Sequence, residues 1–263
     1  MHIIELSFID LNIAALLILG VAGLSWHMRL QLEKKLFVAA LRTTVQLLLI
    51  GHVLRIVFAS SDPWLVAIIA LFMLLVAGRE VMARQHRKIR GWSGWLLGTG
   101  ALFVSSFTVT VFALVLLIGN DPWYAPQYAI PLLGMLFGNT MNGVALSMDR
   151  LTDGLWQQRR IVEQRLLLGQ TSDQATREIR QDAMRSGMIP IINSMAAAGI
   201  VSLPGMMTGQ ILSGTEPVIA VKYQILIMFL IASGTGFGVV AAIWMAGKKL
   251  FDQRHRLRLE RLR

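Results

Sequence analysis

Two pairs of polar side chains interrupt long apolar stretches of this sequence, and their spacing could let them line a route for a polar solute. Arg42 and Gln46 are four residues apart, and Asn139 and Asn142 are three apart, so each pair shares one face of a helix. Polar groups are costly inside lipid, and each pair therefore invites a functional interpretation. For Arg42 and Gln46, a pathway and a helix–helix interface remain equally open. The asparagines need hydrogen-bonding partners in either case.

Other residues predict close packing or a broken helix. Gly134 and Gly138 form a G-x-x-x-G pair, which allows another helix to approach closely. Asn193 lies in an apolar stretch that is rich in small residues, which also favours close packing. Pro204 and Gly205 end or break this helix, because proline lacks a backbone N–H group. A broken helix persists at membrane depth only where protein or water satisfies its backbone, so we predict a gate here.

The chain offers few groups for catalysis or tight metal binding. It contains no cysteine, which excludes disulfides and thiolate metal sites. No H-E-x-x-H spacing or cluster of His, Glu and Asp indicates a catalytic metal, and the identity of any metal ligand stays open. No phosphate-binding G-x-x-x-x-G-K-[ST] motif occurs, so ATP could drive this protein only through another chain. We expect neither enzymatic activity nor a bound cofactor.

Seven apolar segments must position these residues. A hydrocarbon core of about 30 Å requires roughly 20 apolar residues per helix, and lipid cannot satisfy free backbone groups. We therefore predict an all-α, polytopic membrane protein with about seven transmembrane helices, forming a single domain over residues 1–263. The segments are Leu11–Trp26, Leu36–Phe58, Pro63–Gly78, Trp92–Ile118, Tyr124–Met148, Gly187–Met207 and Pro217–Ala246.

The basic residues predict the orientation. Of the 25 Lys and Arg residues, only Arg42, Arg55 and Lys222 lie inside predicted spans, and all others fall in connections on one side. Cationic connections stay cytoplasmic, so the amino terminus is predicted outside and the carboxyl terminus inside. The net charge of +10 suits the anionic inner leaflet of the bilayer, and we expect no nucleic-acid partner. The basic connections are His27–Lys35, Arg79–Gly91, Asp149–Ser186 and the tail Gly247–Arg263.

The longest of these connections, Asp149–Ser186, has the pattern of a helix, a corner and a second helix. Leu155–Leu168 predicts the first helix, and Gly169 provides its stop. A capping box begins at Thr171, and Ile179 continues the apolar spacing of the second helix. Its arginines are nearly balanced by acidic residues, which suits a docking surface better than a lipid-binding one.

Four stretches are more specific than generic membrane sequence. The most specific combines SLPGMM with a TG-x-I-x-x-G-x-x-P spacing and then YQI. With these stretches the chain resembles the FetB/YbbM family, which are bacterial iron-export ABC permeases. The stretches are Arg42 to Gly51 (RTTVQLLLIG), Pro131 to Gly143 (PLLGMLFGNTMNG), Glu163 to Ala175 (EQRLLLGQTSDQA) and Val201 to Phe229 (VSLPGMMTGQILSGTEPVIAVKYQILIMF).

The resemblance implies a multi-pass permease of the cell inner membrane that exports iron and protects against oxidative stress. It implies a separate ATP-binding subunit as partner, with two copies of each chain in the complex. Residues 149–186 would form the coupling loop that docks on this ATPase, and residues 247–263 a basic cytoplasmic tail. Glu163, Gly169 and Ile179 keep the spacing of the importer coupling signature. Arg165 replaces one of its alanines, and no Leu-Pro follows.

Other functions remain open. The same machine could carry another metal, a nucleotide sugar or a small organic solute, since plant relatives of the family are associated with aluminium tolerance. An integral-membrane enzyme or a membrane scaffold without transport would belong to a different class. Cargo-stimulated ATPase activity in the reconstituted pair would separate the transporters from the scaffold.

Overall fold

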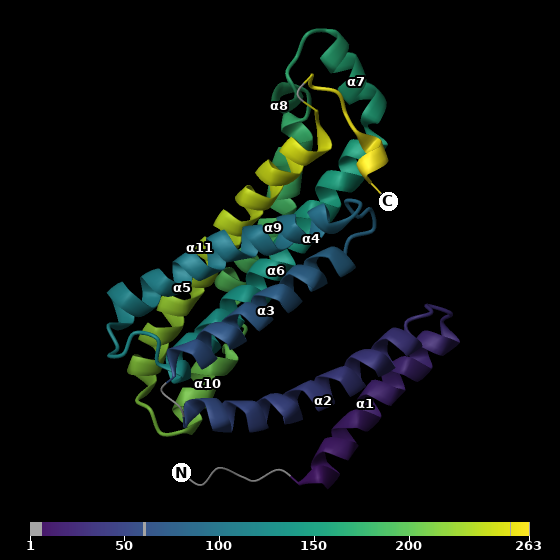
Figure 1. Ribbon diagram of the computed structural model, residues 1–263. Coiled ribbons are helices and arrows are strands. Elements are labelled where there is room, and N and C mark those ends of the chain that lie inside the picture. Colours follow the sequence, from purple (N-terminus) through teal and green to yellow (C-terminus); the bar gives the residue numbers. More distant parts are fainter. Residues whose placement is uncertain (1–6, 60–61, 253, 263) are drawn as a thin grey trace. The chain divides into compact units, whose positions relative to one another are not determined.

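The computed structural model describes residues 7–59, 62–252 and 254–262, and its regular elements are all helical (Figure 1). Within these residues, six helices are long and apolar enough to cross a membrane, which confirms a polytopic all-α membrane protein. The elements are α1 (Phe8–His27), α2 (Glu33–Phe58), α3 (Pro63–Ala83), α4 (Trp92–Leu102), η1 (Phe103–Phe107), α5 (Thr108–Phe112), η2 (Ala113–Ile118), α6 (Pro126–Gln157), α7 (Arg159–Leu167), α8 (Ser172–Ala175), α9 (Arg177–Ala197), α10 (Gly205–Leu212), α11 (Pro217–Leu250) and η3 (Leu259–Arg261).

The chain divides into two compact units, and the first contains the hairpin of α1 and α2. A capping box starts α1, in which the Ser7 hydroxyl accepts a hydrogen bond from the Asp10 N–H group. Ser25 holds the turn between the helices, because its hydroxyl accepts from the Leu32 N–H at 3.1 Å and donates to Glu33 at 3.3 Å. Almost all apolar side chains of the hairpin are exposed. Such a surface suits lipid, where helices gain nothing from hiding apolar groups.

The second unit is a bundle of α3, α4, α6, α9 and α11 whose crossings depend on small residues. A Cβ atom on Gly78 of α3 would lie 2.0 Å from the Thr99 hydroxyl of α4. A Cβ atom on Gly238 of α11 would lie 2.5 Å from Thr140 of α6. Close approach without side chains between the backbones is how membrane helices gain packing energy.

Within the described residues of this chain, the predicted G-x-x-x-G pair Gly134 and Gly138 is not where another helix makes its closest approach to α6. A Cβ atom on Gly138 would meet nothing within 4 Å in the part of the chain that the structure describes, and one on Gly134 would meet only the end of Met73 at 3.4 Å. The close approach occurs farther along α6, where Gly143 faces Gly187 of α9. Sequence spacing marks glycines that permit contact, but the position of the partner helix decides which ones make it.

The predicted segment Gly187–Met207 is not one continuous helix. Helix α9 ends at Ala197, and α10 begins only at Gly205. Between them Gly199 adopts φ +82°, and its N–H donates to the Ser202 carbonyl at 2.8 Å. A positive φ strains any residue with a side chain, so a glycine suits this turn. The break therefore precedes Pro204 by several residues, and Pro204 lies just before α10.

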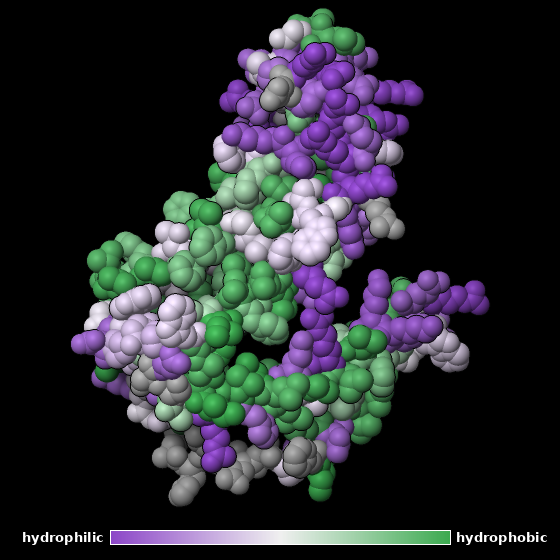
Figure 2. Space-filling model, in the orientation of Figure 1, coloured by the Kyte–Doolittle hydropathy of each residue, from purple (hydrophilic) through white to green (hydrophobic). Residues whose placement is uncertain are grey.

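Three of the predicted cytoplasmic connections meet at one end of the second unit. The N–H of His86 donates to the Asp149 carboxylate at 2.6 Å, and the N–H of Arg90 donates to the Arg261 carbonyl at 2.7 Å. Ser172 N–H donates to His255 Nδ1 at 3.3 Å. Hydrophilic side chains gather over this end, at the top of Figure 2, and hydrophobic ones over the middle of the bundle. Basic segments that are far apart in sequence thus form one polar end.

Candidate functional site

The corner between α7 and α8 is the most distinctive feature at the polar end of the second unit. Gly169 adopts φ +86°, and its N–H donates to the Leu166 carbonyl at 3.0 Å. This left-handed glycine ends α7 as the sequence predicts. Leu167 and Leu168 are 88% and 84% exposed beside it. Two adjacent leucines are thus exposed in an otherwise polar loop. We call Leu167, Leu168 and Gly169 the apolar tip. Exposed apolar surface of this kind is typical of a protein-binding site.

The second arm of the corner begins as predicted and then breaks. Thr171 N–H donates to the Gln174 side chain at 3.0 Å, and Gln174 N–H donates back to the Thr171 hydroxyl at 3.4 Å, which confirms the capping box. Helix α8 ends after one turn, and α9 begins at Arg177. The Thr176 hydroxyl, at the break, donates to the Ser172 carbonyl at 2.7 Å. The corner is therefore closed by local hydrogen bonds on both sides.

The four predicted coupling residues divide into two groups. Glu163 and Gly169 are exposed on the surface of the loop. Arg165 instead holds the two arms together, because its guanidinium pairs with Glu178 at 3.1 Å and donates to the Ala175 carbonyl at 3.4 Å. Ile179 is only 6% exposed and packs on α6. The latter two position the apolar tip and do not themselves present a surface.

The loop is fixed to the bundle through Trp156 at the end of α6. The Arg87 guanidinium lies 4.4 Å from the centre of the Trp156 ring, and that of Arg159 lies 5.2 Å from it. Arg87 also pairs with Asp153 at 3.4 Å. Cation–π contacts and ion pairs of this kind join the connection after α3 to the start of α7.

The candidate pathway residues do not gather around one cavity that the described residues define. Asn142 of α6 accepts a hydrogen bond from Arg84, at the end of α3. Asn139 donates to the Met135 carbonyl of its own helix at 2.8 Å. Asn193 is exposed on α9. Sequence reasoning did not identify Arg84 as the partner of Asn142, because Arg84 lies in a basic connection where one more cation does not indicate a role.

The remaining pathway candidates lie elsewhere. Arg42 and Gln46 are exposed on α2, in the first unit. Pro204 and Gly205 lie at the start of α10, directly after the break that follows α9. The sequence thus located the interrupted segment but not where the helix stops.

Three buried hydroxyl side chains, on α6, α11 and η1, were not singled out from the sequence. Thr140, Thr235 and Ser106 are at most 1% exposed. Within the described residues their hydroxyl groups have no hydrogen-bond partner. Single Thr and Ser residues in apolar helices are common, so their burial gives no sequence signal. Among the same residues, no group of three or more His, Asp or Glu side chains could hold a metal ion.

Comparisons with known proteins agree over nearly the whole chain. A sequence model of the family described as "Uncharacterised protein family (UPF0014)" matches residues 8–251. A UPF0014 membrane protein of Synechocystis is 38% identical over 97% of this chain and 98% of its own length. "Probable iron export permease protein FetB" of Escherichia coli is 30% identical over 97% of this chain and 96% of its own. "Protein ALUMINUM SENSITIVE 3" of Arabidopsis thaliana is 31% identical over 93% and 87%. No solved structure matches the chain.

Proposed function

Because this chain belongs to the UPF0014 family of membrane proteins, we propose that it is the permease subunit of an ABC transporter that exports iron across the cell inner membrane. A separate ATP-binding subunit supplies the energy, and two copies of each chain form the complex. The relative named as an iron export permease supports the cargo, since the similarity extends over nearly the full length of both proteins. The proposal assigns ATP hydrolysis to the partner and no catalytic step to this chain.

The proposed topology has seven crossings, with the amino terminus outside and the carboxyl terminus inside. The second unit supports it, because α3, α6 and α11 all run toward the polar end. The contacts of Gly143 with Gly187 and of Gly154 with Ile179 make α9 antiparallel to α6. Helix α9 and α10 together then lead the chain away from the polar end, as one crossing that is interrupted at residues 198–204. We propose this interruption, with Pro204 and Gly205, as a gate.

The observation that carries the proposal is the apolar tip at the corner between α7 and α8. Leu167 and Leu168 lie in a polar loop, so their exposure leaves apolar surface in water. Full burial of one leucine side chain contributes about 1.5–3 kcal/mol, which a cleft in a partner subunit can provide. The near neutrality of the loop favours such docking. The tip is fixed to α6, α9 and the end of α3 by Arg165, Ile179 and Trp156. A partner that docks on the tip would therefore move these helices.

Co-purification with the ATP-binding subunit tests the docking role. We expect the double substitution Leu167→Ser, Leu168→Ser to reduce recovery of the ATPase by more than tenfold, since roughly 3 kcal/mol of apolar burial is lost. Leu30→Ser is the matched control, because Leu30 is a half-exposed leucine in another basic connection. Equal ATPase recovery with the double variant and the wild type would contradict docking at the tip.

A cargo assay must include more than one metal. The relative named for aluminium sensitivity is as similar to this chain as the one named for iron export. Inverted membrane vesicles that contain the complex should take up iron when ATP is added. ATP-dependent uptake of aluminium with no uptake of iron would keep the transporter and replace the cargo.

A further inference from the structure

An open apolar groove runs along the outside of the second unit, between α9, α11 and the η1–α5 segment. Met184 and Met188 line it from α9, and Phe237 and Val240 line it from α11. Its volume is about 920 Å³, and its lining is almost wholly apolar. Phe237 and Val240 are more than half exposed. We call this feature the lateral groove.

A polar pocket of about 520 Å³ lies at the end of α11, between α8, α9 and the carboxyl-terminal segment. Arg180, Lys248 and Arg261 contribute three cationic side chains to its lining. The Ser172 side chain and His255 also border it. We call this feature the basic pocket.

Trp244 lines both features, so the lateral groove and the basic pocket adjoin each other at this side chain. The groove follows α11 from Ser233 to Trp244, which spans about 16 Å at 1.5 Å per residue. Half of a bilayer core of about 30 Å has the same length. The groove therefore matches the acyl chains of one leaflet, with an aromatic ring at the level where chains meet headgroups.

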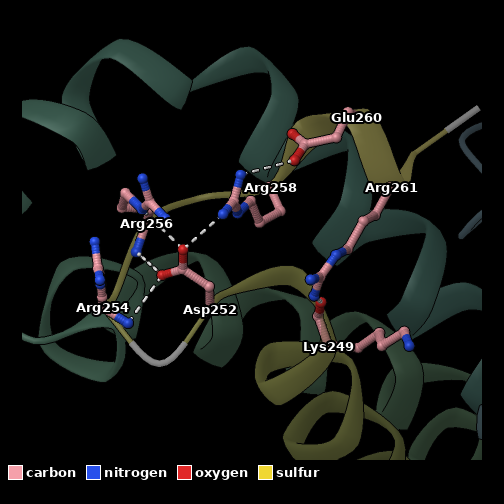
Figure 3. A network of polar contacts seen from close by, with 7 residues as sticks. All are labelled: Lys249, Asp252, Arg254, Arg256, Arg258, Glu260 and Arg261. Atoms are coloured by element: carbon pink, nitrogen blue, oxygen red, sulfur yellow. Dashed lines mark hydrogen bonds and ion pairs between the residues drawn. The ribbon is translucent and has the colours of Figure 1, made fainter.

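The charges at the basic pocket favour an anion. Its two carboxylates are already neutralised, because Asp173 pairs with Arg180 and Asp252 pairs with Arg256 at 2.8 Å and Arg258 at 3.0 Å (Figure 3). In the described part of the chain, no carboxylate pairs with Lys248 or Arg261. The Lys248 ammonium lies 3.7 Å from the centre of the Trp244 ring. Two cations of the pocket are thus not neutralised by a carboxylate of the described residues, and one of them, Lys248, lies over the aromatic ring.

The carboxyl end of α11 borders the basic pocket, but its carbonyl groups do not repel an anion bound in that pocket. Free carbonyl groups give a helix carboxyl terminus a partial negative charge. Here the Arg261 guanidinium donates to the Lys249 carbonyl, and the Arg258 N–H donates to the Leu250 carbonyl at 2.8 Å. The carboxyl-terminal segment therefore covers these two oxygens with hydrogen-bond donors, one of which is a cation.

We propose that the lateral groove and the basic pocket together bind one anionic phospholipid of the inner leaflet. Its acyl chains lie against Phe237, Val240 and Met188, and its phosphate is held by Lys248 and Arg261 beside Trp244. The bound lipid joins α11, α9 and the carboxyl-terminal segment. The proposal requires only that this end of the bundle lies at the cytoplasmic face, and it is independent of the cargo and of the ATPase.

Native mass spectrometry of the full chain in neutral detergent tests this site. The probes are phosphatidylglycerol, phosphatidylcholine with the same acyl chains, and inorganic phosphate. We expect one phosphatidylglycerol to be retained in preference to phosphatidylcholine, and the double substitution Lys248→Gln, Arg261→Gln to weaken that retention at least about fivefold. The control is Lys249→Gln, Arg254→Gln, which removes the same charge from residues outside the pocket (Figure 3). It should retain lipid as the wild type does.

Several results would overturn the proposal. If both double variants weakened phosphatidylglycerol retention equally, the retention would reflect general attraction to a basic surface and not this pocket. If phosphatidylglycerol and phosphatidylcholine were retained equally, the groove would bind acyl chains without any contribution from the pocket. If inorganic phosphate bound as tightly as phosphatidylglycerol, the pocket would be a site for free anions.

Val240→Trp, which fills the groove, should lower lipid retention without changing the oligomeric state. A change from dimer to monomer in that variant would assign the groove to a second copy of this chain. Lys248→Gln alone provides the test if the double variant fails to fold.

Discussion

Gly143 of α6 and Gly187 of α9 lie so close that a Cβ atom on either would meet the carbonyl oxygen of the other, at 2.9 and 2.7 Å respectively. This contact joins the helix that carries the polar loop to the helix that leads into the proposed gate. The atoms in contact belong to the two backbones, so they cannot move aside as the end of a flexible side chain would. The pair therefore sets the distance between the two helices.

Alanine at Gly143 or Gly187 should destabilise the bundle by about 1–3 kcal/mol, because the added methyl forces two backbones apart. Gly138→Ala is the control, since a Cβ atom there has open space and alanine is favoured over glycine in a helix by about 1 kcal/mol. Thermal unfolding in detergent measures both. A melting temperature of Gly187→Ala at or above that of Gly138→Ala would contradict the contact.

Gly169→Val should leave membrane insertion intact but uncouple ATP hydrolysis from transport. A Cβ atom at Gly169 would meet no atom within 4 Å, so the effect comes from φ +86°, which costs a β-branched residue roughly 1–2 kcal/mol. Gly169→Asn, which tolerates this conformation, should retain coupling. Transport and ATPase activity are measured per assembled complex. Normal coupling in the valine variant would reject a role of this corner in docking.

The carboxyl-terminal segment should keep its structure down to acidic pH. Hydrogen bonds from the Arg256 N–H and guanidinium and from the Arg254 N–H lower the pKa of Asp252 from 3.8 to about 2. A lowered pKa means that the ionised carboxylate stabilises the folded segment above pH 3.8, and that this contribution is lost as the pH falls through about 2. Limited proteolysis after residue 250 should therefore be unchanged between pH 8 and about 5.

Asp252→Asn removes the charge without changing the size of the side chain. Cleavage of this segment in Asp252→Asn should be faster at pH 7 than in the wild type. Asp182→Asn is the control, because among the residues that the structure describes Asp182 pairs only with the exposed Arg185, three residues along the same helix. Equal cleavage rates in all three proteins would show that the Asp252 contacts do not hold the segment.

Single cysteines test the orientation without background, because the chain has none. We expect Asp121→Cys and Thr215→Cys to react with a membrane-impermeant maleimide in intact cells. Asp173→Cys should react only after permeabilisation. Labelling of residue 173 from outside would contradict the proposed topology.

Sequence reasoning predicted features that depend on local interactions. The helical spans follow from apolar length, the end of α7 from Gly169, and the start of α8 from Thr171 and Gln174. Each depends on residues within one or two turns of each other. The family resemblance was confirmed over residues 8–251.

The remaining features depend on contacts between distant segments. No local signal exists for the Gly143–Gly187 contact or for the bond from Arg84 to Asn142. The same holds for the folding of residues 251–252 and 254–262 onto the polar end. The break after Ala197 was placed too late, because Pro204 was a stronger breaker in the sequence than Gly199. The exposure of Leu167 and Leu168 could have been suspected from two apolar residues directly before a helix stop, in a polar connection.

ATP-driven iron transport by the reconstituted complex tests the central claim most directly. Proteoliposomes that contain this chain and its ATP-binding subunit, with the ATPase facing outward, should accumulate radiolabelled iron when ATP is added. The Leu167→Ser, Leu168→Ser variant should lose that accumulation, and Leu30→Ser should keep it. ATP-dependent accumulation that is the same in all three proteins would contradict coupling through the apolar tip, and no accumulation of iron by the wild-type complex would contradict iron export.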